Sequence, residues 1–105
     1  MQSFRQVIMR NREMKRREDT IARVLQMEQS FDEITEVVRM NPELLQNDES
    51  MKEKVQELIA YYESGLWLQD YESDERGELP RELKRGVLSE DGLYNLLSDI
   101  KNMDE

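Results

Sequence analysis

Residues 20–40, TIARVLQMEQSFDEITEVVRM, decide the fold of this chain because they carry its clearest helical pattern. Apolar side chains recur here at alternating spacings of three and four residues, which is the spacing of one face of an α-helix. The stripe consists of Val24, Met27, Phe31, Ile34 and Val38, widened by Ile21 and Leu25. The other faces then carry Glu28, Asp32, Glu33 and Glu36. The segment predicts a long amphipathic helix that buries one stripe.

A second helix with the same apolar spacing is predicted over residues 50–64. Pro42 ends the first helix because it disfavours helical backbone at the residue before it. Asn47 or Asp48 can cap the second helix, and Gly65 suits the left-handed position just beyond its end. So short a connection predicts an antiparallel helical hairpin with a shared apolar seam.

Residues 80–103 predict a helix-to-helix junction and a last helix. Pro80 suits the first position of a short helix, PRELKR, which Gly86 would end. Ser89 is placed to cap the last helix. The fold class is therefore all-α, with an antiparallel helical hairpin, a C-terminal helix and short helices in the linker. We expect residues 1–18 to be a basic extension, helical or frayed, and residues 19–105 to form a single domain.

The stretch LPRELKRGVLSEDGLY, with the upstream RVLQMEQSFDEI, resembles a small bacterial family of unknown function. The resemblance covers roughly residues 21–100 and leaves residues 1–18 outside. It implies a compact helical bacterial domain. It implies no catalytic residues.

Composition excludes most catalytic chemistry. The 105 residues contain no histidine and no cysteine, so histidine-activated nucleophiles, imidazole or thiolate metal sites and disulfides are all excluded. Neither glycine-rich phosphate-binding pattern is present. We expect no enzyme activity and no cofactor, with carboxylate-based chemistry as a remote exception.

No apolar run is long enough to span a bilayer, and the N-terminus lacks the apolar core of a secretory signal. Together with the absence of cysteine, these features predict a cytoplasmic protein.

Charge is distributed unevenly along the chain. Residues 1–17 hold six cations against Glu13 alone, so this segment carries +5 and the other 88 residues carry −14 of the net −9. The candidate contact residues here are Arg10, Arg12, Arg16 and Arg17. They could contact nucleic acid, an anionic membrane or a second copy of the chain, and the acidic remainder favours the last. A solvent-exposed tail is the plain alternative.

An acidic run over residues 70–78 resembles the start of a calcium-binding loop. Such a loop requires glycine at its sixth position and glutamate at its twelfth, where this chain has Glu75 and Arg81. The pattern fails, so we assign no metal ligands and expect a solvated acidic loop.

Five further residues are candidate contact positions. Trp67 and Tyr71 lie one helical turn apart and are expected in the core, unless exposure makes them interface anchors. Lys84 and Arg85 could bind an anion, but they would also complement the end of a helix before Gly86. Gly92 falls in the first turn of the last helix, where glycine is unfavourable, and predicts close packing, for example against residues 70–77.

The function that follows is that of a non-catalytic interaction or adaptor module, which binds another protein or its own copy. The alternative is nucleic-acid binding through residues 1–17.

Overall fold

The computed structural model describes the backbone of residues 4–103 and the side chains of residues 12–103, and it confirms an all-α fold. Five α-helices follow one another: α1 (Phe4–Met40), α2 (Leu44–Asn47), α3 (Glu49–Glu63), α4 (Leu66–Glu75) and α5 (Gly92–Met103). A 3₁₀ turn, η1 (Gly86–Leu88), precedes α5. Over the described residues no helix is both long and apolar enough to cross a membrane.

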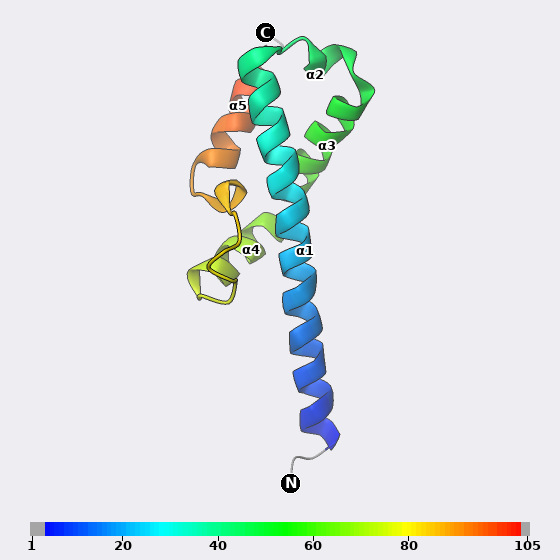
Figure 1. The fold of residues 1–105 in the computed structure, drawn as a ribbon, viewed down its shortest axis with the longest axis vertical. Helices are drawn as coiled ribbons and strands as arrows, with labels where there is room; N and C mark the ends of the chain where they lie inside the picture. The colour runs from blue at the N-terminus through cyan, green and yellow to red at the C-terminus, as the bar shows by residue number, and fades with distance from the viewer. Residues whose placement is uncertain (1–3, 104–105) are drawn as a thin grey trace.

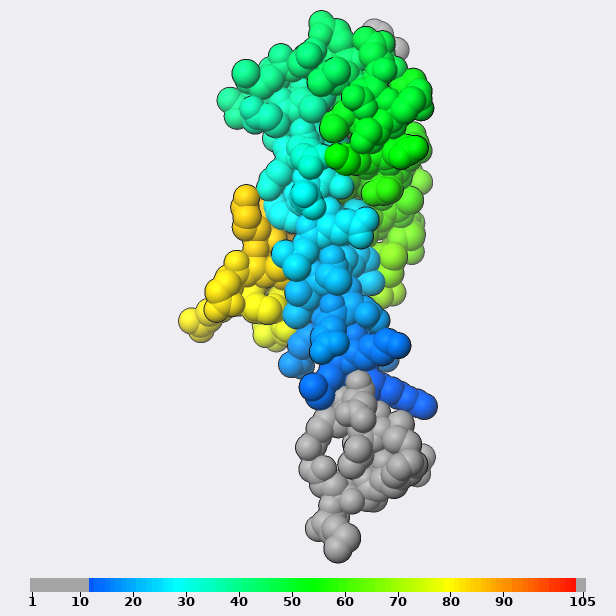
Figure 2. All heavy atoms as spheres, turned by 45° about the vertical axis from the view of Figure 1, so that its right-hand side comes forward, coloured from blue at the N-terminus to red at the C-terminus, as the bar shows by residue number. Residues whose placement is uncertain are grey.

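Helix α1 forms the long axis of the molecule, which measures 62 × 24 × 23 Å (Figure 1). It runs unbroken through the basic segment because no glycine or proline interrupts it. Its later part packs against α3 and α5, whereas residues 12–19 are all exposed. In Figure 2, α1 lies in front, flanked by α2 and α3 on one side and by residues near 80 on the other. The part of α1 before Thr20 therefore extends beyond the buried core.

Local sequence signals position α3 as expected. The backbone N–H of Met51 donates to Asp48 Oδ1 at 3.2 Å, which caps the start of the helix. Gly65 follows its end with φ +90°, a left-handed conformation that glycine adopts without steric cost. An ion pair joins Lys54 of α3 to Glu33 of α1. Helix α3 thus runs back beside α1 (Figure 1).

Two elements differ from the prediction. Residues 80–85 form turns, so the expected PRELKR helix is wrong, and Gly86 begins the 3₁₀ turn η1 and does not end a helix. Most of the acidic run expected as a loop, up to Glu75, belongs to α4. The expected cap of α5 is present, since Ser89 Oγ accepts from the N–H of Gly92 at 3.1 Å.

A single core joins all the helices. Its buried apolar side chains are Val24, Ile34, Leu45, Val55, Leu58, Tyr61, Leu79, Val87, Leu88, Leu93 and Leu96.

The exposure of two α1 side chains differs from the prediction. Leu25, expected in the buried stripe, is 53% exposed, and Glu28, expected on a solvent face, is 5% exposed. Glu28 is stabilised there because its Oε2 accepts from the buried N–H of Val87 at 3.1 Å.

Candidate interaction site between helices α1 and α4

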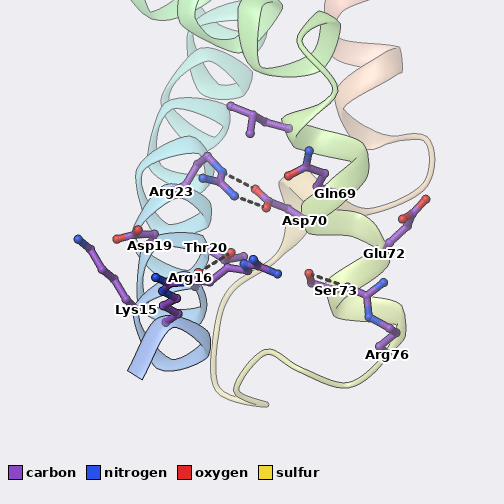
Figure 3. Close-up of a pocket in the computed structure, with 12 residues that line it drawn as sticks. Lys15, Arg16, Asp19, Thr20, Arg23, Gln69, Asp70, Glu72, Ser73 and Arg76 are labelled. Carbon is purple, nitrogen blue, oxygen red and sulfur yellow. Dashed lines mark hydrogen bonds and ion pairs between the residues drawn. The ribbon is translucent and has the colours of Figure 1, made fainter. Parts of the chain in front are cut away.

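A buried carboxylate, Asp70, ties three helices together at the base of this site. Its side chain is 1% exposed and receives two hydrogen bonds from Arg23 of α1, Nε to Oδ2 at 2.9 Å and Nη2 to Oδ1 at 2.6 Å (Figure 3). The hydroxyl of Tyr61 on α3 donates to Oδ2 at 2.7 Å. A two-point guanidinium–carboxylate pair fixes relative orientation as well as distance. We call Arg23, Tyr61 and Asp70 the buried anchor.

The buried anchor shifts two proton equilibria. Burial, and then the hydrogen bond to Asp70, raise the pKa of Tyr61. The hydrogen bond to Asp70 also raises the pKa of Arg23, against a smaller opposing effect of burial. Tyr61 therefore stays a hydrogen-bond donor and Arg23 stays charged through the neutral range.

We expect the free energy of unfolding to fall as pH rises above about 10, where tyrosine in the unfolded chain loses its proton. Folded Tyr61 keeps its proton there, so the unfolded state binds fewer protons and high pH favours it. Urea denaturation across this range should give a shallower decline for Tyr61→Phe than for the native chain. Tyr94→Phe, at a side chain that is 58% exposed, is the matched control. Equal slopes for the native chain and Tyr61→Phe would contradict the assignment.

Next to the buried anchor, α1 and α4 enclose a groove of about 470 Å³. We call it the α1/α4 groove. A second hollow of about 350 Å³ continues it toward Leu79 and shares Arg16, Thr20, Ser73 and Arg76 with it. Figure 3 places Arg16 between the two helices, whereas Lys15 points away from α4.

The cations on the α1 wall of this groove are available to a ligand. Within residues 12–103, Arg12, Lys15 and Arg16 form no ion pair. On the opposite wall Arg76 is engaged, since its Nε lies 2.8 Å from Glu78 Oε1, and this hydrogen bond lowers the pKa of Glu78. Unpaired guanidinium groups beside a groove are suited to bind carboxylate or phosphate oxygens.

Of the remaining candidates on the basic segment, Arg17 lines the second hollow. The side chain of Arg10 lies outside the described part of the chain.

Trp67 and Tyr71 pack together on α4. Their rings stack with centroids 5.2 Å apart, and Tyr62 contacts Trp67 at 5.3 Å. The indole Nε1 of Trp67 donates to the carbonyl of Val87 at 2.8 Å. Both side chains are half-buried, and Trp67 lies against the core. Through this hydrogen bond Trp67 holds the segment before α5 against α4.

Lys84 and Arg85 have a different role from the one expected. No helix ends at Gly86, so they do not complement a helix C-terminus. Lys84 Nζ lies 3.1 Å from Asp32 Oδ2 of α1, and Arg85 bonds Asp74 of α4 and the carbonyl of Pro80. These contacts fasten the 80–85 turns to both flanking helices.

The close packing predicted at Gly92 is confirmed, although its partner differs. A Cβ at this position would lie 2.3 Å from Ser89 Oγ, 3.0 Å from the carbonyl oxygen of Gly86 and 3.5 Å from Phe31 Cζ. The nearest atoms therefore come from η1, the α5 cap and α1, and not from residues 70–77.

Sequence reasoning missed the buried members of this site. Asp70 lies three residues after Trp67, a spacing that makes the two residues neighbours on the helix surface. Glu28 likewise falls between Val24 and Phe31 on the apolar stripe. An acidic residue at an apolar position is the signal that would have found both. Among the described residues, no three acidic side chains gather closely enough to hold a metal ion.

Residues 24–105 match the model of a domain of unknown function, DUF4298. The comparison with curated proteins gives no match. The comparison with solved structures gives none either.

Proposed function

This chain belongs to the DUF4298 family, and we propose that it is a cytoplasmic, non-catalytic interaction module that binds an acidic segment of another protein in the α1/α4 groove. The observation that carries this proposal is that Arg12 and Arg16, which line one wall, form no ion pair within residues 12–103. The acidic side chains of a partner would supply the missing counter-charges.

The groove supports binding better than catalysis. Its deeply buried carboxylate, Asp70, already accepts three hydrogen bonds from Arg23 and Tyr61. The absence of histidine and cysteine from the whole sequence removes imidazole as a proton-transfer group and the thiol as a nucleophile.

Nucleic acid is the second candidate, because the same cations would attract phosphates. The charge of the remaining chain argues against it, since residues 18–105 carry −14 and would repel a long polyanion. Among the side chains that the structure describes, no aromatic residue lines the groove, so bases would have no ring to stack on.

We expect Arg12→Glu/Arg16→Glu to weaken binding of a glutamate-rich helical peptide at least about tenfold, because two attractive contacts become repulsive. Fluorescence anisotropy of a labelled peptide measures the affinity. Arg39→Glu, at an exposed cation near the other end of α1, is the matched control and should leave binding unchanged.

The same titration with a short DNA duplex distinguishes the two candidates. Tighter binding of the duplex than of the peptide, with steep weakening by salt and loss in Arg12→Glu/Arg16→Glu, would replace the proposal with nucleic-acid binding. Binding of neither probe would overturn both.

A further inference from the structure

A second groove lies between α3 and α5, and apolar side chains dominate it. Ile59 and Tyr62 of α3 line one wall, and Tyr94, Leu97 and Ile100 of α5 line the other, around a space of about 500 Å³. Helix α5 has two apolar sides, because Leu93 and Leu96 are buried in the core while Tyr94 is 58% exposed. Within residues 12–103, no element covers the second side.

This α3/α5 groove continues into an adjoining hollow of about 330 Å³, which shares Val55 and Ile100 and reaches Leu45 and Met103. Together the hollows follow α3 over residues 52–63, which corresponds to about 17 Å of helix. The groove is therefore long enough for three turns of a docked helix.

The arrangement of the surrounding helices leaves space for a docked helix. Helix α1 packs against both α3 and α5, whereas α3 and α5 meet each other at few points. A further helix between α3 and α5 would complete a four-helix bundle. We propose that residues 4–17 of a second copy of this chain supply that helix.

The length and sequence of this segment fit the groove. Its apolar residues Phe4, Val7, Ile8 and Met14 recur at helical spacing over about 15 Å, close to the length of the groove. Met14 is 57% exposed, as expected for a side chain that lacks its partner. Apolar side chains at such spacings are the usual anchors of a helix docked in a groove.

Charge also favours a second copy as the occupant. Residues 1–17 carry +5 and the remainder of each chain carries −14. The charged residues that line the two hollows, Lys52, Glu63 and Lys101, nearly balance, so the attraction comes from the acidic body as a whole. The basic segment would therefore approach an acidic body.

With a two-fold axis perpendicular to α1, each chain inserts its basic segment into the groove of the other chain. Each α1 extends beyond its own body at one end, while α3 and α5, whose residues line the groove, lie toward the other end (Figure 1). In an antiparallel pair, each basic segment then reaches the groove of its partner. This proposal concerns a different groove from the one assigned to acidic peptides, although the docking segment includes Arg12, Lys15 and Arg16, which line that other groove.

Analytical ultracentrifugation of the full chain tests the proposal. We expect a dimer whose dissociation constant rises at least about tenfold in Tyr94→Glu, because a charge would then lie at the centre of the apolar contact. Leu68→Glu, at a side chain of α4 that is 51% exposed, is the matched control and should leave the dimer intact. A native chain that stays monomeric, or a dimer that Tyr94→Glu does not weaken, would overturn the proposal.

Disulfide trapping identifies the contact, because the native chain has no cysteine. Ile8→Cys and Tyr94→Cys chains, mixed and oxidised, should form a mixed cross-link faster than either forms a homodimer. Faster cross-linking of Tyr94→Cys to itself would show a different interface and overturn the assignment. Peptide binding by the α1/α4 groove is measured separately, so failure of one proposal leaves the other testable.

Discussion

Replacement of Arg23 by methionine should lower the free energy of unfolding by about 3 kcal/mol, because it leaves a buried carboxylate without its counter-charge. Asp70 is 1% exposed and would retain only the hydroxyl of Tyr61. The side chain of Arg23 is itself 26% exposed, so water reaches one end of the pair and the loss falls at the lower end of the range for buried pairs. Urea denaturation followed by circular dichroism measures the change.

Two further variants test the cause of this loss. Asp70→Asn in the Arg23→Met background removes the uncompensated charge and should restore part of the stability. Lys52→Met breaks an exposed pair with Glu49 and should cost less than about 1 kcal/mol. If Arg23→Met costs no more than Lys52→Met, the buried anchor does not hold the three helices together as proposed.

Gly92→Ala should destabilise the fold by about 2 kcal/mol, although alanine is the better helix former. The new methyl group would lie 2.3 Å from Ser89 Oγ and 3.0 Å from the carbonyl oxygen of Gly86. Rotation of the serine relieves the first contact only by breaking the cap of α5, which is worth about 1 kcal/mol. The second contact involves backbone and requires η1 to shift.

A double-mutant cycle separates these two contacts. In Ser89→Ala/Gly92→Ala the hydroxyl is absent, so the pair should cost less than the sum of the single variants. Additive costs would show that the carbonyl of Gly86 causes the strain. An unchanged melting temperature in Gly92→Ala would contradict the close packing altogether.

Local signals predicted the helix boundaries well where they involve capping. Asp48, Gly65 and Ser89 each act within a few residues of the sequence that identifies them, so no knowledge of the tertiary fold is needed. The continuity of α1 follows equally directly from the absence of glycine and proline.

The PRELKR segment shows where such signals fail. Its residues favour a helix, but six residues gain too few internal hydrogen bonds to offset other contacts. Arg85 instead bonds Asp74 and the carbonyl of Pro80, while Leu79 and Val87 on either side enter the core. Tertiary contacts therefore decide the conformation of these residues.

The buried anchor could not be predicted from neighbouring residues in the sequence, for a similar reason. Arg23 and Asp70 are separated by 47 residues, so nothing in either neighbourhood identifies the other. Asp70 alone was detectable, as an acid three residues after Trp67 and therefore beside it on the helix surface. The sequence predicted the cations of the α1/α4 groove as part of a basic segment. It did not predict that α4 would form the opposite wall of a groove beside them.

Trp67 gives this molecule a built-in optical reporter. It is the only tryptophan in the chain, and its indole N–H is bound to the carbonyl of Val87 between α4 and η1. Its emission wavelength depends on how much water reaches the ring, so it should shift to the red when residues 80–88 detach from α4. Detachment of this segment can therefore be timed in the unmodified protein, separately from loss of helix. A difference between the two rates would reveal whether the C-terminal part of the domain opens before the long helices separate.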